Sequence, residues 1–316
     1  MGRFALRKAF HLHAWLRGRA KLVRLAAAVT LAAALMGAAP ATAADVAEFY
    51  RGKRVNIIVG YGPGGGYDLF ARMLARYMGA HIPGAPAVSV QNMPGAARLR
   101  AINHLATAAP KDGTVMAALD RNMPLIAFVG GSPNVQFDPL KLTWLGALSD
   151  SSMDAFVMWT RKRPDIQRVD AFLPPGGPTL TVSVAGAGAT DNDVAALLRD
   201  VLGLRLPIVP AYQDSNKIAH AIEGADTQGN MQVLLQFARA TRLPELSKTP
   251  TAQELAKDDA ALQIIRMTEL PYVISRPFAA PPDVPADRPQ ALQAAFTRAA
   301  GENPAWWRRP PNCNLT

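Results

Sequence analysis

The chain has almost no cysteine, and the one it has cannot form an internal disulfide. Of its 316 residues only Cys313 is a cysteine, close to the end of the chain. The fold must therefore be stabilised by its apolar core, even in an oxidising compartment. Apolar residues make up 49% of the sequence. This length and composition allow two lobes of roughly 100 to 150 residues each.

Catalytic and metal-binding motifs are also lacking. The sequence has no G-x-S-x-G motif and no Walker lysine. His11 and His13 belong to the N-terminal region, and His81, His104 and His220 stand alone, without metal-ligand spacing or a partner cysteine. The sequence thus indicates no catalytic residue, no metal site and no cofactor, and we expect a protein that is not an enzyme.

Acidic residues are absent from positions 1 to 44, which hold seven basic ones. Without these seven, the net charge of +10 falls to +3, which argues against a nucleic-acid-binding surface. The same region has a basic start, an apolar core from Leu25 to Met36 and a small-residue exit at Ala41 to Ala43. This pattern predicts a signal peptide over residues 1–43 and export to the periplasm. A membrane anchor and an amphipathic surface helix are the alternatives.

Glycine, in contrast, is concentrated in the stretch GYGPGGGYD, Gly60 to Asp68. It follows a short apolar run, Val55 to Val59, and precedes apolar residues at helical spacing, so it predicts a strand, a turn and a helix. Glycines let backbone N–H groups point inward, and a helix N-terminus adds partial positive charge, so the loop predicts a site for a small anion. Asp68 either caps the helix or faces the ligand.

A nucleotide is the alternative occupant of this loop. Gly60, Gly62 and Gly65 match the G-x-G-x-x-G fingerprint. However, Pro63 interrupts the loop, and the next expected strand leads to Asn92 rather than to an acidic residue that could bind a ribose. An enzyme of the nucleotide-binding α/β class therefore remains the second hypothesis.

Strands and helices alternate along the rest of the chain. Further strands are expected at 87–91, 114–119, 180–185 and 206–209, and helices at 96–109, 191–202 and 288–300. This alternation predicts parallel sheets flanked by helices, in two lobes. The turn from Ala185 to Asp191 again joins a strand to a helix. Each lobe would therefore offer successive backbone N–H groups at a helix N-terminus to an anion in the cleft.

Several segments, in this order, resemble one family. They are VNIIVGYGPGGGYDLFARMLARYM, VSVQNMPGAARLRAINHLATAAPKDGTVMAAL, FDPLKLTWLGAL, VSVAGAGATDNDVAALL, MQVLLQFA with LPELSKTPTAQEL, and RPFAAPPDVPADRPQALQAAF. The chain thereby resembles the extracytoplasmic solute-binding proteins of tripartite tricarboxylate transporters, the Bug-type family.

The resemblance implies an α/β, two-lobed Venus-flytrap fold, each lobe a mostly parallel sheet flanked by helices. We expect lobe 1 to comprise residues 44–147 and 233–316, because the chain could return to it near the apolar run Met231 to Phe237, and lobe 2 to comprise residues 148–232. The resemblance further implies a receptor that clamps a small carboxylate between two glycine loops and delivers it to membrane permease subunits or a sensor protein, with no nucleic acid involved. The implied ligand-binding residues are Tyr61, Gly65, Gly66 and Asp68 in the first loop, Gly186, Gly188, Ala189 and Thr190 in the second, and Asn122 and Tyr212 beyond them.

The chain departs from the family pattern at two places. After AIEGADTQGN it passes directly to MQVLLQFA, so lobe 2 is expected to be shortened. Pro310 and Pro311 exclude the family's terminal helix. These departures add a third hypothesis, namely that the protein is a decayed paralogue that no longer binds a ligand.

Overall fold

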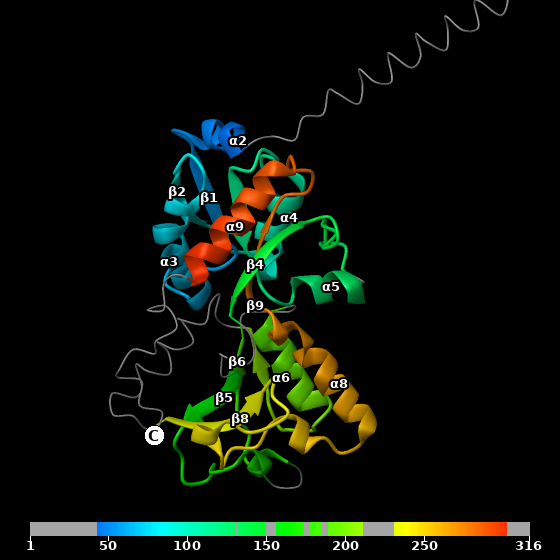
Figure 1. Cartoon of the computed structure of the whole chain (residues 1–316). Helices are drawn as coiled ribbons and strands as arrows, with labels where there is room; N and C mark the ends of the chain where they lie inside the picture. Colours follow the sequence, from blue (N-terminus) through cyan, green and yellow to red (C-terminus); the bar gives the residue numbers. More distant parts are fainter. Residues whose placement is uncertain are drawn as a thin grey trace, which may run out of the picture. The chain divides into compact units, whose positions relative to one another are not determined.

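The computed structural model describes residues 43–130, 132–149, 156–173, 177–184, 189–210 and 231–301. Figure 1 shows these residues as helices and strands. The expected signal peptide, Gly186, Gly188, Tyr212 and the C-terminal prolines lie outside the described residues. Helix α2, Ala43–Tyr50, begins the described chain.

Lobe 1 is built on a five-stranded sheet in the order β2-β1-β3-β9-β4. Strands β1 and β2 and strands β1 and β3 pair in parallel, while β9 runs antiparallel to both of its neighbours, β3 and β4. The strands are β1 (Arg54–Val59), β2 (Ala87–Asn92), β3 (Val115–Ala118), β4 (Thr143–Ser149) and β9 (Ser275–Ala280). The mostly parallel sheet predicted from the sequence is confirmed for this lobe.

Helices cover both faces of this sheet (Figure 1). On one face, α3 (Gly66–His81) and α9 (Asp287–Gly301) pack over Ile57 and Met116. On the other face, α4 (Leu99–Thr107) and the start of α5 (Met123–Val129) pack over Ile58 and Ala117. Consecutive residues of one strand thus enter opposite cores, because side chains alternate across a sheet. Burial on both faces explains why residues 57–59 of β1 and all of β3 are apolar.

Lobe 2 has a core of its own. Among the described residues, β5 (Phe156–Arg161) pairs antiparallel with β8 (Met231–Phe237), and β6 (Val182–Ser183) pairs in parallel with β7 (Ile208–Val209). Helices α6 (Thr190–Asp200) and α8 (Asp259–Glu269) pack on this core. Short 3-10 helices complete the lobe: η2 (Val169–Phe172), η3 (Pro244–Leu246), η4 (Gln253–Leu255) and η5 (Leu270–Val273).

The boundary expected at residue 233 needs correction. Strand β8 pairs with β5, and Leu234, Leu235 and Phe237 are buried in the lobe 2 core together with Ile265 and Tyr272. The chain therefore rejoins lobe 1 only at β9, some 40 residues later than expected. An apolar run predicts a buried strand, but it carries no information about which sheet that strand joins.

The helix expected from residue 96 also begins later. Ala96, Ala97 and Arg98 form a short turn, η1 (Ala96–Arg98), with positive φ angles of 48°, 49° and 74°. Left-handed backbone is rare for non-glycine residues and cannot continue a right-handed helix. Helix α4 therefore starts at Leu99. Within the described part of the chain, none of the helices is long and apolar enough to cross a membrane.

Candidate ligand-binding site

The loops that follow β1, β2 and β3 meet at one edge of the lobe 1 sheet. Because β1 lies between β2 and β3 and all three are parallel, their carboxyl ends point to the same side. In open α/β sheets, ligands bind at this edge. Tyr61 and Asn122, two of the residues implied by the family resemblance, lie in the first and third of these loops.

Asp68 holds the glycine loop in its conformation. It is buried in the first turn of α3, and it accepts hydrogen bonds from the Gly64 amide (2.7 Å), from Arg72 Nε (2.9 Å) and from Asn92 Nδ2 (2.8 Å). Burial favours its neutral form, but the bonds from Arg72, Gly64 and Asn92 outweigh burial and lower the pKa of Asp68. The carboxylate therefore ties the loop to α3 and to the end of β2.

There is open space beside the first residues of α3. A Cβ placed on Gly66 meets no atom within 4 Å, and one placed on Gly65 meets only the Gly62 carbonyl oxygen at 3.7 Å. Gly64 has a φ of 85°, which a residue with a side chain rarely adopts. Space for a small group thus exists next to the first backbone N–H groups of the helix.

Asp120 is the centre of the hydrogen-bond network, and the sequence analysis missed it. Its Oδ2 accepts from the Tyr61 hydroxyl (2.5 Å), and its Oδ1 accepts from the backbone N–H of Asn122 (2.7 Å) and from Thr190 Oγ1 (2.8 Å). Its carboxylate is fully buried. Burial, followed by the neighbouring Asp120 charge, raises the pKa of Tyr61 well above its ordinary value. The only sequence signal for Asp120 was an acidic residue directly after the third strand.

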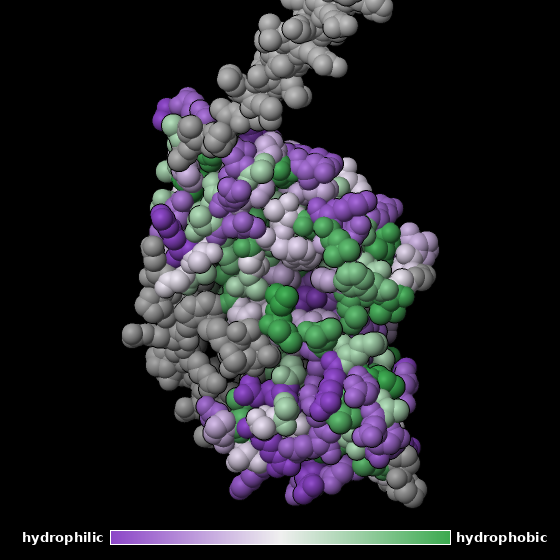
Figure 2. Space-filling view, turned by 45° about the vertical axis from the view of Figure 1, so that its right-hand side comes forward, coloured by the Kyte–Doolittle hydropathy of each residue, from purple (hydrophilic) through white to green (hydrophobic). Residues whose placement is uncertain are grey.

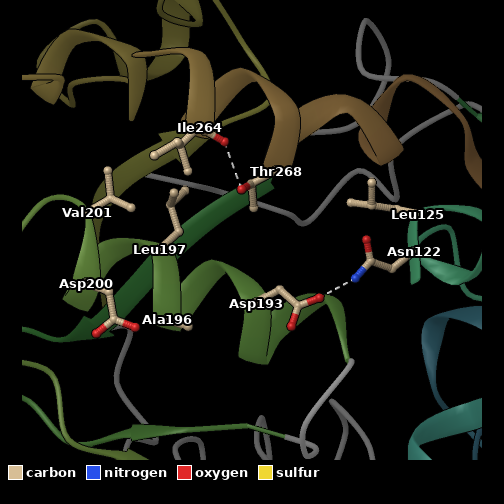
Figure 3. A pocket seen from close by; sticks show the side chains of 9 residues that line it. All are labelled: Asn122, Leu125, Asp193, Ala196, Leu197, Asp200, Val201, Ile264 and Thr268. Carbon is tan, nitrogen blue, oxygen red and sulfur yellow. Dashed lines mark hydrogen bonds between the residues drawn. The ribbon is translucent and has the colours of Figure 1, made fainter. Parts of the chain in front are cut away.

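The first turn of α6 in lobe 2 contacts lobe 1 through polar groups. Besides the bond from Thr190 to Asp120, Asn122 Nδ2 donates to Asp193 Oδ2 (Figure 3). Burial raises the pKa of Asp193. Residues from the two lobes thus meet at the carboxyl edge of the sheet. On the face shown in Figure 2, the surface is hollowed, with a hydrophilic floor and an apolar border.

Arg98 lies within the same set of contacts. Its Nε is 3.3 Å from Asp120 Oδ2, its Nη2 is 3.7 Å from Asp191 Oδ1 in lobe 2, and its guanidinium lies 4.5 Å from the centre of the Tyr61 ring. Tyr61 in turn stacks on Tyr67, with ring centres 4.2 Å apart. Burial opposes the charge of Arg98, but Tyr61, Asp120 and Asp191 together raise its pKa.

Arg121 makes a second set of contacts between the two lobes. Its guanidinium lies over the rings of Phe156 (4.3 Å) and Tyr272 (4.7 Å), both of which pack with the lobe 2 core. Its Nη1 donates to Ser275 Oγ at 3.0 Å, and its backbone amide donates to the Tyr67 hydroxyl at 3.3 Å. Such stacked cations contribute about 0.5 to 2 kcal/mol each. Sequence reasoning missed Arg121 because its partners are distant along the chain.

A groove opens beside the contact between Asn122 and Asp193. Its volume is ≈ 290 Å³, and Figure 3 shows that its lining residues lie on or next to α5, α6 and α8. Its walls are mainly apolar, with Asp193 and Asp200 as the acidic members. The lining residues are Asn122, Leu125, Asp193, Ala196, Leu197, Asp200, Val201, Ile264 and Thr268.

Most of the expected site residues that the structure describes come together. Tyr61, Asn122 and Thr190 all bind Asp120. Ala189 is buried at the N-cap of α6 and precedes Thr190. Gly65, Gly66 and Asp68 lie on the first glycine loop and the start of α3. In the described parts of the chain, no group of three or more His, Cys, Asp or Glu side chains could hold a metal ion.

Sequence comparison finds one curated relative. No profile of a known protein family matches the chain. The chain is 26% identical over 168 residues to a UPF0065 protein of Agrobacterium vitis from the TAR-I ttuE-ttuC′ intergenic region. The match covers 53% of this chain and 47% of the relative, so the chain matches about half the length of that protein. UPF0065 proteins are Bug-type proteins.

Comparison with solved structures finds periplasmic binding proteins rather than enzymes. MatC from Rhodopseudomonas palustris, solved with malate, has a TM-score of 0.57 and 21% identity, over 78% of this chain and 84% of MatC. Another R. palustris protein, solved with adipate, has a TM-score of 0.60 and 17% identity, over 78% and 82% of the two chains. The periplasmic binding protein BugD has a TM-score of 0.56 and 19% identity, over 79% and 83%. The chain therefore has the two-lobed α/β fold of periplasmic solute-binding proteins, and over about half of its length it is similar to a Bug-type protein, in line with its sequence motifs.

Proposed function

We propose that the protein is a periplasmic receptor that closes its two lobes on a small carboxylate and delivers it to the membrane permease of a tripartite tricarboxylate-type transporter. The observation that carries this proposal is the convergence on Asp120. Tyr61 and Asn122 reach it from two loops of lobe 1, and Thr190 reaches it from lobe 2. A ligand that contacts both lobes at this point favours the closed arrangement, because only that arrangement makes all the contacts.

The ligand is held mainly by backbone groups in this proposal. Gly65 and Gly66 offer N–H groups at the start of α3, where space is open. Ala189 and Thr190 offer further backbone groups at the start of α6. Asp68 acts indirectly, by fixing the loop through Gly64. Tyr61, Asn122, Gly186, Gly188 and Tyr212 complete the proposed set.

The relatives support the ligand class and the compartment. MatC was solved with malate and another similar protein with adipate, and both are dicarboxylates. The basic and apolar segment before Ala44 fits export to the periplasm. We assign no catalytic step, because we identify no activated nucleophile among the described groups that donate hydrogen bonds to Asp120.

Thermal unfolding with added acids tests the proposal. Purified protein is heated alone and with millimolar malate, adipate, succinate or benzoate, each compared with its amide. A ligand of the native state raises the midpoint by mass action, so we expect a rise with at least one acid and none with its amide. A midpoint that only nucleotides raise would favour the enzyme hypothesis. A cooperative transition that no acid moves would reject the receptor proposal, and the absence of any transition would favour a decayed paralogue.

A further inference from the structure

Arg98 is a buried cation in the contact region between the lobes. Its side chain is only 7% exposed. It lies against Asp120 and the Tyr61 ring of lobe 1 and against Asp191 of lobe 2. The backbone of Arg98 is left-handed, as is that of the two alanines before it. Unfavourable backbone conformations of this kind persist where the surrounding structure holds them, and they are frequent at ligand sites.

The guanidinium of Arg98 is not satisfied by hydrogen bonds. Its Nε and Nη1 are buried and have no hydrogen-bond acceptor among the described residues. The nearest carboxylate oxygen, Asp120 Oδ2, lies 3.3 Å from Nε, but the two atoms do not form a hydrogen bond. The contact between Asp120 and Arg98 is therefore electrostatic. A buried charged donor without an acceptor is costly, and a planar carboxylate is the group that a guanidinium binds best.

The charges at the start of α6 also favour Arg98 as the group that binds a carboxylate. The first turn of this helix carries Asp191 and Asp193. These negative charges oppose the binding of an anion at the helix N-terminus, despite its partial positive charge. A carboxylate that enters here needs a cation, and Arg98 is the buried cation next to Asp191.

We propose that the Arg98 guanidinium is the anchor for a carboxylate of the ligand, an inference that rests on the receptor function proposed above. The ligand carboxylate accepts from Nη1 and takes the place of Asp191 on the lobe 2 side. Asp191 is then a competitor of the ligand. Its Oδ1, 3.7 Å from Nη2, is buried, but the side chain as a whole is 36% exposed, so it can turn toward solvent when the ligand binds. The proposal limits the ligands to acids that have a carboxylate able to reach Arg98 beside the first turn of α6.

Two substitutions with opposite expected effects test this inference. Isothermal titration with malate, adipate, succinate and benzoate is carried out on the full protein and on Arg98→Met, Arg98→Lys and Asp191→Asn. We expect Arg98→Met to weaken the binding of the best acid by about 10- to 100-fold, as for the loss of a charge-assisted hydrogen bond. Arg98→Lys should lie between this variant and the wild type. Asp191→Asn should tighten binding by about 3- to 10-fold, because it removes the competing charge.

Arg100→Met is the matched control, because Arg100 lies two residues further on, in the first turn of α4, and is exposed. It should bind as the wild type does. If Arg98→Met also binds as the wild type does, the anchor is rejected while the receptor function stands. If the wild type binds none of the acids, the receptor function is rejected and the anchor with it. If Arg98→Met does not fold, Asp191→Asn decides, since weaker or unchanged binding by that variant would overturn the inference.

Discussion

Asp120 is the residue on which most of the contacts at the site depend. It accepts hydrogen bonds from Tyr61, Asn122 and Thr190, and it is the nearest counter-charge of the buried Arg98. We expect Asp120→Asn to lower the free energy of unfolding by about 3 to 5 kcal/mol, since removing one partner of a buried pair leaves the other charge uncompensated. Urea denaturation measures this change.

Asp283→Asn is the control for this prediction. Asp283 forms an ion pair with Lys111 at the surface, where its side chain is 76% exposed. Exposed ion pairs contribute little because solvent screens their charges, so the control should lose little stability. Equal losses in the two variants would mean that Asp120 is no more important than a surface carboxylate.

Glu269 gives a prediction that depends on pH. It ends α8 and is buried, and its carboxylate accepts from the Ala238 amide (2.8 Å) and Gln253 Nε2 (2.7 Å). Burial raises its pKa above the ordinary 4.5. A carboxyl group with a raised pKa in the folded state remains protonated there while it ionises in the unfolded chain, so stability falls as the pH rises from about 4.5 through the raised value.

Glu269→Gln should remove this part of the pH dependence. Below about pH 4 the variant and the wild type should be equally stable, and above the raised pKa the variant should be the more stable of the two. Denaturation curves between pH 3.5 and pH 8 measure the difference. Glu245→Gln, at an exposed position in the same lobe, should show no such trend. A difference between Glu269→Gln and the wild type that does not change with pH would contradict the assignment.

The family resemblance implied three of the residues that the structure brings together at Asp120, namely Tyr61, Asn122 and Thr190. Their contact with a ligand stays a proposal. Asp120 and Arg98 were missed, because their importance comes from partners up to 93 residues away along the chain. A single acidic residue after a strand and a single arginine before a helix look like ordinary surface charges in a sequence.

At the scale of elements, the left-handed turn before α4 is the clearest local conflict. Ala97 has φ 49° and ψ 42°, a conformation that glycine adopts without penalty and alanine does not. We expect Ala97→Gly to stabilise the protein by about 1 kcal/mol, as the relief of strain exceeds the greater freedom that glycine has in the unfolded chain.

Ala106→Gly is the matched control, because it makes the same substitution inside the regular part of α4. It should destabilise the protein by about 1 kcal/mol. The two variants should therefore shift the midpoint of thermal unfolding in opposite directions. A shift in the same direction for both would show that the turn does not store strain.

Elements with strong periodic patterns were predicted well. The strands β1 and β3 and the helices α3 and α9 lie close to where the apolar spacing placed them. The helix expected from residue 96 began three residues late, because the preference of alanine for helices hid the left-handed turn. Local helix propensity cannot predict the tertiary contacts of Arg98 with Asp120 and Tyr61.

For the whole molecule, the two-lobed fold followed from the order of the motifs, but the division between the lobes did not. Strand β8 was assigned to lobe 1 from its apolar run, while its partner β5 and its buried neighbours lie in lobe 2. Pairing between strands that are distant in sequence is decided by the packing of the whole core. A run of apolar residues fits either sheet equally well.

Hydrogen exchange on two core variants tests the corrected division. Leu235 of β8 and Met116 of β3 are both fully buried, so replacing either by alanine should cost about 2 to 5 kcal/mol. Because each lobe has its own core, the lost protection should remain in the lobe that carries the substitution. Leu235→Ala should speed exchange mainly in α6 and α8, and Met116→Ala mainly in β1 and α3. If Leu235→Ala instead exposed β9 and α9 first, β8 would belong with the first sheet, as the apolar pattern had suggested. The chain would then cross between the lobes before β8 rather than at β9.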